Sequence, residues 1–177
     1  MTVNLTAGSD RRVSGGADSL SLDIGLLALR VFFGGLLAVH GSQKLFGWFD
    51  GDGWQRTTAG FEKMGYNPGK LFGTLAGLCE FTGGALLLLG LLTPLGAAIA
   101  LGTMINAMNV TWHGGLKGYE HALLFAVAAA ALGFTGPGRF SLDHGRPWAR
   151  RGVAWGIGAV ALAVIAALLT LAAKWAF

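Results

Sequence analysis

Charged residues are scarce in this sequence: Asp, Glu, Lys and Arg make up 12% of its 177 residues, whereas 53% are hydrophobic. A soluble domain usually carries about twice that charged fraction. The single cysteine, Cys79, excludes an intrachain disulfide and a CxxC dithiol, and with them self-contained dithiol redox catalysis. The Arg and Lys residues lie mainly at the flanks of apolar segments, where they suit membrane orientation and anionic lipid headgroups. We therefore expect membrane lipids, and no nucleic acid, as partners.

Recognised metal-binding and catalytic spacings are also missing. Histidine and carboxylate are suitable ligands for a transition metal, but the chain has no HExxH motif, no ExxH pair and no HxxxH pair. Two facing histidines could hold a haem, and His40 with His121 or His113 is the available combination. A lone histidine on an apolar helix is more often a hydrogen-bonded core residue, so we expect neither haem nor metal. No Ser-His-Asp or paired-carboxylate spacing assigns a reaction.

Five long apolar stretches dominate what the sequence does contain. A bilayer-spanning helix needs roughly 20 mostly apolar residues, and these stretches approach or exceed that length. The 30 glycines fall mostly inside them, where small residues let helices approach closely in lipid. The sequence therefore predicts an all-α membrane helical bundle. The expected spans are residues 22–46, 70–92, 95–112, 119–134 and 153–173, each bound being approximate.

The polar segments divide the chain. Residues 1–21 are polar and rich in Gly and Ser, and we expect a disordered cytoplasmic tail there. Residues 22–145 are expected to form a four-helix core, and residues 146–177 a linker and a fifth transmembrane helix. The loop at 50–69 contains a short amphipathic piece. Five spans place the termini on opposite sides, and the arginine-rich loop after the fourth span favours a plasma-membrane protein with a cytoplasmic N-terminus and an external C-terminus.

Ionisable and amide side chains interrupt the apolar spans. Such groups are costly inside a membrane unless they are paired, hydrated or used. His40 and Lys44 are one helical turn apart and share a face, and Glu80 lies deep enough to need a cation, for which Arg30, Lys44 or His40 are candidates. Most of the group is expected to converge on the outer half of the bundle. The candidate cluster is Arg30, His40, Lys44, Glu80, Asn106, Asn109, His113, Glu120 and His121.

Three roles for this cluster remain open. The polar groups can pair with one another and fix how the helices dock. They can instead line a pocket for a small amphipathic or redox ligand such as a quinone headgroup. A third role is the movement of protons or ions.

Four short segments resemble the DoxX family. The run LALRVFFGGLLAVHGSQKLFGWF (27–49) is similar to the opening helix of that family, and residues 76–97 are similar to its glutamate-containing second helix. Residues 119–120 and the segment GPGRFSLD (136–143) complete the pattern, so the resemblance covers residues from about 24 to 145. It implies a four-helix membrane core to which this chain adds a fifth span. The residues that match family positions are Arg30, His40, Lys44, Glu80, Glu120, Arg139 and Asp143.

The resemblance also implies a cellular setting. The family takes its name from an association with terminal-oxidase and thiosulfate:quinone oxidoreductase systems, and some members are linked to oxidative stress and thiol-redox complexes. We favour a non-catalytic membrane subunit or scaffold of a redox or respiratory assembly, acting with protein partners or as a homo-oligomer. The alternative is a quinone- or lipid-binding membrane oxidoreductase subunit with a polar intramembrane pocket. A small transporter is a third, more distant hypothesis.

Overall fold

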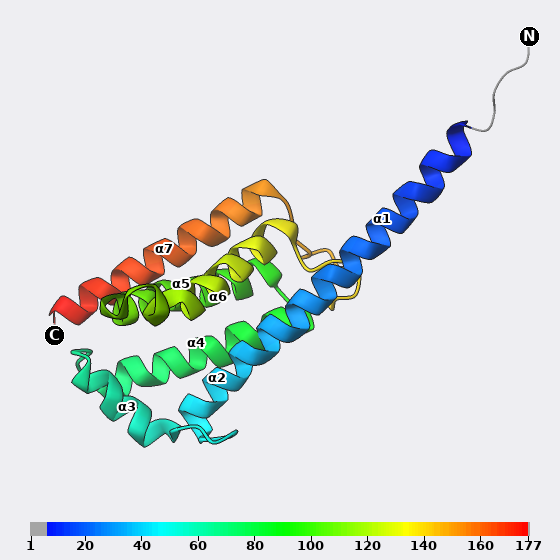
Figure 1. Cartoon of the computed structure of the whole chain (residues 1–177). Coiled ribbons are helices and arrows are strands. Elements are labelled where there is room, and N and C mark those ends of the chain that lie inside the picture. Colours follow the sequence, from blue (N-terminus) through cyan, green and yellow to red (C-terminus); the bar gives the residue numbers. More distant parts are fainter. Residues whose placement is uncertain (1–6, 177) are drawn as a thin grey trace, which may run out of the picture.

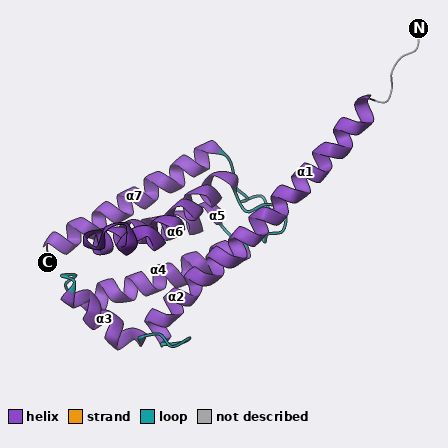
Figure 2. Ribbon diagram, viewed as in Figure 1, coloured by secondary structure: helices purple, strands orange, loops and turns teal. Residues whose placement is uncertain are grey.

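A computed structural model gives the structure of the protein over residues 7–176, with side chains described from residue 18 onward. Every regular element in this range is a helix, and no strand occurs within it. Figure 2 shows the helices joined by short loops, with one longer loop before the last helix. The predicted all-α membrane bundle is confirmed.

The first span is one continuous helical rod. It consists of α1 (Ala7–Leu29), a π-helical turn η1 (Arg30–Gly34) and α2 (Gly35–Phe46), and Gly47 ends it in the left-handed conformation. Residues 7–21, expected to be a disordered tail, are therefore helical, while residues 1–6 lie outside the described residues. The physical reason is that an apolar span supplies the helix nucleus, after which each added residue gains one hydrogen bond. Figure 1 shows α1 continuing beyond the rest of the bundle.

The remaining elements form the rest of the bundle. Four apolar segments of the described chain are long enough to cross a membrane, and the longest, Thr93–Thr135, contains two helices joined by the short turn η2. These two helices pack along each other more extensively than any other pair, so the chain folds back between them. The described chain thus runs along the bundle five times, and α1 begins at the opposite end from that where α7 ends (Figure 1). The elements are α3 (Gly53–Lys63), α4 (Gly69–Leu89), α5 (Thr93–Thr111), η2 (Trp112–Gly114), α6 (Gly115–Thr135) and α7 (Val153–Ala176).

Glycines bring α2 and α4 into close contact. A Cβ atom at Gly41 would lie 2.3 Å from the backbone nitrogen of Phe81, and one at Gly84 would lie 2.4 Å from that of Ala38. Only glycine fits at such distances, and association in lipid depends on close packing of this kind. The glycine contact fixes α2 against α4 and so determines which side chains of the two helices face each other.

The two ends of the bundle carry different structures. The loop of residues 136–152 covers one end, which we call the loop end. The short helix α3 lies across the opposite end, the α3 end, and packs against the start of α4 (Figure 1). There the backbone of Thr58 approaches Gly69 and Gly73 so closely that a Cβ at either glycine would lie within 3.0 Å of it. The predicted amphipathic piece in the loop at 50–69 is therefore a helix that closes this end.

Candidate functional site

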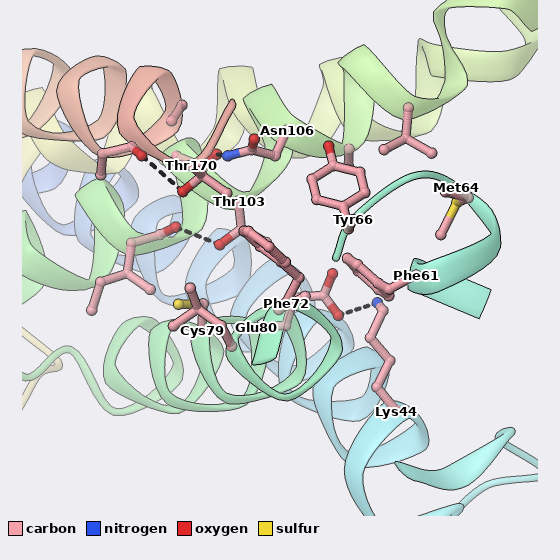
Figure 3. A pocket seen from close by; sticks show the side chains of 18 of the residues that line it. Lys44, Phe61, Met64, Tyr66, Phe72, Cys79, Glu80, Thr103, Asn106 and Thr170 are labelled. Atoms are coloured by element: carbon pink, nitrogen blue, oxygen red, sulfur yellow. Dashed lines mark hydrogen bonds and ion pairs between the residues drawn. The ribbon is translucent and has the colours of Figure 1, made fainter. Parts of the chain in front are cut away.

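A buried ion pair joins the first two spans near the α3 end. The Glu80 carboxylate on α4 is paired with the Lys44 ammonium group on α2. The Glu80 side chain is 6% exposed and that of Lys44 30%. Gly77 lets α2 approach α4 here, because a Cβ at this position would lie 2.8 Å from the side chain of Leu45 and 3.3 Å from the Cβ atom of Lys44. Of the three cations that the sequence offered to Glu80, the structure places Lys44 against it, as Figure 3 shows.

Beside the ion pair lies a largely apolar cavity of about 410 Å³, which we call the main cavity. Its walls come from α4, α5 and α7, and residues of α3 and of the connection to α4 form one side (Figure 3). Ligand pockets for small molecules typically have volumes of about 300–1,000 Å³ and are mostly apolar with a few placed polar groups. The main cavity has this size and character.

The main cavity reaches the outer surface of the bundle. Two of its lining residues, Met64 after α3 and Leu75 on α4, are 40% and 44% exposed. In a membrane the exposed face of α4 contacts lipid. The cavity is therefore open on the side where Met64 and Leu75 reach the surface.

Tyr66 is a fixed polar group of the main cavity. Its side chain is 2% exposed, and the rings of Phe61 and Phe72 contact it edge-on at centroid distances of 5.5 and 5.3 Å. The Lys174 ammonium group of α7 lies 4.3 Å from the ring centroid. The Tyr66 hydroxyl is buried and has no hydrogen-bond partner among the described residues. Burial raises the pKa of this phenol above its ordinary value, so the hydroxyl keeps its proton at neutral pH.

Asn106 is the second unpaired polar group of the cavity. Its Nδ2 group donates to the carbonyl oxygen of Gly102 at 3.1 Å, while its Oδ1 atom is buried without a partner in the described chain. The neighbouring hydroxyls of Thr103 and Thr170 each donate to a carbonyl oxygen of their own helix. The hydroxyl of Tyr66 and the Oδ1 atom of Asn106 are thus unpaired polar atoms of two residues that line the cavity.

A second cavity of about 190 Å³, here called the histidine cavity, lies on the other side of the ion pair. Lys44 and Glu80 line both cavities, and His40 and His121 line only the second. The two imidazole rings are perpendicular at a centroid distance of 5.6 Å, and His121 also contacts Phe125 at 4.6 Å. Because His121 is exposed, the histidines connect the ion pair to the surface near the α3 end.

Arg30 belongs to a different part of the molecule. It is 1% exposed and donates to the carbonyl oxygen of Phe140 in the loop that covers the loop end. Gly90 leaves the space for its guanidinium group, since a Cβ there would lie 1.9 Å from Nη1. Arg30 lines neither the main cavity nor the histidine cavity. It fastens the first span to the loop.

Asp143 organises the same end. Its fully buried carboxylate accepts hydrogen bonds from the backbone N–H groups of Leu92 and Thr93, both at 3.1 Å, and from the indole of Trp148 at 3.0 Å. A carboxylate at this position accepts hydrogen bonds from free N–H groups at the start of α5. Its negative charge also interacts favourably with the positive end of the α5 helix dipole. Asp143 therefore has a structural role at the loop end.

Comparison with protein-family models identifies the family of this chain. The DoxX family model matches residues 25–114, which is just over half of the chain. The chain belongs to the DoxX family. The match includes α2, α3, α4 and α5, whereas residues 119–120 and 136–143, on which the resemblance also rested, lie beyond it. No curated protein and no solved structure matches the chain. It is a multi-pass membrane protein of the DoxX family.

The structure brings five of the predicted site residues of this DoxX chain to the two cavities and separates the others. Asn109, His113 and Glu120 are exposed and line neither cavity. Because α5 ends at Thr111, His113 lies in the turn η2 and not on the helix that carries Asn106 and Asn109. No group of three or more His, Cys, Asp or Glu side chains within the described range could hold a metal ion. The residues at the cavities are His40, Lys44, Glu80, Asn106 and His121.

One side of the main cavity of this DoxX protein, formed by Phe61, Met64 and Tyr66, was not predicted from the sequence. A signal for it existed. Phe61 and Met64 are three residues apart on the amphipathic piece, and Tyr66 is an aromatic residue directly before the turn into α4. Aromatic residues with a polar tip suit a membrane interface. This pattern indicates a segment at the membrane interface, but it does not predict that the Tyr66 side chain points into the bundle.

Proposed function

We propose that this DoxX protein binds a lipid-soluble molecule with a compact, oxygen-bearing polar end, of the quinone class, in the main cavity. The observation that carries the proposal is one apolar cavity, open at the bundle surface, whose lining includes an ion pair and two residues with unpaired polar atoms. The ion pair is Lys44–Glu80, and the unpaired groups belong to Tyr66 and Asn106.

The lining suits the two parts of such a molecule. Apolar side chains of α4, α5 and α7 offer a dry wall for a ring and the beginning of an alkyl tail. The exposed Leu75 marks where the tail leaves toward the lipid. The Lys44 ammonium group is a charged donor beside the cavity, and charged donors form strong hydrogen bonds to oxygen atoms. Binding of an amphipathic molecule therefore satisfies both the apolar and the polar surfaces.

The unpaired groups argue against a purely structural role for this end of the bundle. Leaving a buried donor or acceptor without a partner costs about 1–3 kcal/mol, and such groups are rare in native proteins. A bundle that needed only internal docking would gain stability from Phe in place of Tyr66. The two unpaired atoms are explained if a ligand completes their hydrogen bonds.

The test is extraction of the protein from its own membrane under gentle conditions, with native mass spectrometry and identification of the released small molecules. We expect a quinone-class or similar amphipathic molecule in about stoichiometric amount. Ala76→Phe fills the main cavity and should abolish retention, whereas Ala131→Phe makes the same change at an exposed position of α6 that lines neither cavity. Equal retention by the two variants, or no binding of a short-chain quinone or its hydroquinone by the purified protein, would overturn the proposal.

The same preparation addresses the setting implied by the family. We propose a plasma-membrane protein with its N-terminus in the cytoplasm, acting beside redox or respiratory enzymes in oxidative stress. The exposed apolar face of α7 supports a contact with lipid or with a partner in the membrane, as does its length of 24 residues. Respiratory or redox subunits that co-purify without any small molecule would favour the scaffold hypothesis over the binding hypothesis.

A further inference from the structure

We propose that the main cavity selects a ligand whose polar end carries a hydroxyl group, and so prefers the hydroquinone form of a quinone to its carbonyl form. The acceptor for this hydroxyl is Oδ1 of Asn106. The inference rests on the proposed function and adds to it the chemical form of the ligand.

The orientation of the Asn106 amide is fixed by its helix. The Nδ2 group donates to the carbonyl oxygen of Gly102, which is an acceptor only. Turning the amide over would place its own oxygen against that carbonyl, so the hydrogen-bond network assigns Oδ1 to the opposite direction. Oδ1 is buried and unpaired in the described structure, and Asn106 lines the main cavity. An acceptor without a donor therefore lies in a residue of the cavity wall.

The other lining groups do not supply this donor. The hydroxyls of Thr103 and Thr170 are engaged with the carbonyl oxygens of Ile99 and Ala166. The Lys44 ammonium group is paired with Glu80 and makes no hydrogen bond to Oδ1 of Asn106. Tyr66 lines the cavity as well, but its hydroxyl is also unpaired, which places it beyond hydrogen-bond distance of Asn106. The missing donor is expected from the bound molecule.

Tyr66 supplies the complementary contact. Its phenol keeps its proton and can donate to an oxygen of the ligand, while Phe61, Phe72 and Lys174 hold the ring in place. In Figure 3, Tyr66 and Asn106 lie on neighbouring parts of the cavity wall. One fixed donor and one fixed acceptor match a hydroxyl-bearing ligand, because a hydroxyl both donates and accepts.

The two oxidation states of a quinone differ in this one respect. A quinone carbonyl oxygen only accepts, so it would leave Oδ1 of Asn106 unpaired and opposed to another electron-rich oxygen. A hydroquinone donates to the same atom. Sites built to hydrogen-bond a hydroxyl discriminate strongly against an analogue that lacks it, because their own polar groups are then left unpaired. We expect the hydroquinone to bind at least about tenfold more tightly.

The experiment uses the full-length protein in lipid nanodiscs under anaerobic conditions. The probes are a decyl-substituted 1,4-benzoquinone and its hydroquinone, each titrated calorimetrically with empty nanodiscs as the blank. In Asn106→Leu we expect the preference to disappear, with the hydroquinone falling to the affinity of the quinone. The matched control Asn109→Leu removes an exposed amide from the same helix and should leave the preference intact. Tyr66→Phe removes a donor that both forms use and should weaken both.

The outcomes separately test the preference for a hydroxyl group, its assignment to Asn106 and the proposed function. Equal affinity of the two forms for the unaltered protein overturns the hydroxyl inference while the proposed function stands, and this comparison needs no variant. A preference that survives Asn106→Leu shows that another group causes it and overturns the assignment to Asn106. No binding of either form overturns the proposed function itself.

Discussion

The Lys44–Glu80 pair allows the relation between charge and stability in this bundle to be tested quantitatively. The perturbations are Lys44→Met, Glu80→Gln and the double variant. Removing one partner of a buried pair leaves an uncompensated charge, which is far costlier than removing both. Because the two side chains differ in exposure, at 6% for Glu80 and 30% for Lys44, the two single variants should differ as well.

The magnitudes follow from that asymmetry. Lys44→Met leaves the buried Glu80 carboxylate without a cation, and we expect the free energy of unfolding to fall by about 3 kcal/mol. Glu80→Gln leaves a lysine whose long stem can carry its charge toward water, so the expected loss is about 1 kcal/mol. The double variant should lose no more than about 2 kcal/mol, compared with a sum of about 4, which gives a coupling of about 2 kcal/mol.

The assay is reversible unfolding in mixed micelles with increasing SDS, followed by circular dichroism and tryptophan fluorescence. Lys117→Met is the matched control, since Lys117 is exposed and lines neither cavity. A Glu80→Gln variant less stable than Lys44→Met would refute the role assigned to exposure. Losses that add to within about 0.5 kcal/mol would refute the pair as an energetic unit.

Three other predictions concern the packing and the two ends. Gly41→Leu should prevent folding or lower the free energy of unfolding by more than about 3 kcal/mol, because its Cβ would lie 2.3 Å from the backbone of α4. Gly35 has open space around it, so Gly35→Leu should change the free energy of unfolding by no more than about 0.5 kcal/mol in the same assay. Asp143→Ala should lower the free energy of unfolding by about 3 kcal/mol by leaving buried donors unpaired, and the exposed His144→Ala should not. In intact cells with a cysteine-free background, a membrane-impermeant maleimide should label Asp52→Cys and not His144→Cys; the reverse pattern would refute the proposed orientation.

The helical membrane architecture could be predicted from hydrophobicity, but the length of the first helix could not. The spans were visible because each crossing needs a long apolar run, and Thr93-Pro94 marked a short connection that forces neighbouring helices to be antiparallel. The polar stretch before Leu22 carried no apolar signal, so its helical state depended on the span that follows it. Hydrophobic composition predicts which segments enter the membrane, but it does not predict how far a helix continues beyond the membrane.

The site was only partly predictable, because the position of a residue along a membrane span does not fix the direction in which its side chain points. Lys44 and Glu80 were found from the cost of charge in a membrane, and the structure joins them. Asn106 and Asn109 looked equivalent in sequence, yet one lines the main cavity and the other is exposed. Tyr66 carried no charge and lay in a loop, so only the packing of α3 against α4 places it inside.

The two ends of the bundle show why an unpaired polar atom alone does not mark a binding site. Arg30 also has buried nitrogen atoms without a hydrogen-bond partner in the described chain, but its guanidinium group is enclosed by Gly90 and the loop and lines neither cavity. Asp143 acts on it electrostatically, and a hydrogen bond to Phe140 anchors it. At the α3 end the unpaired atoms belong to Tyr66 and Asn106, and both residues line the main cavity, which is open at the bundle surface. We propose that a ligand completes their hydrogen bonds there, whereas Arg30 at the loop end is held by the loop and lines neither cavity.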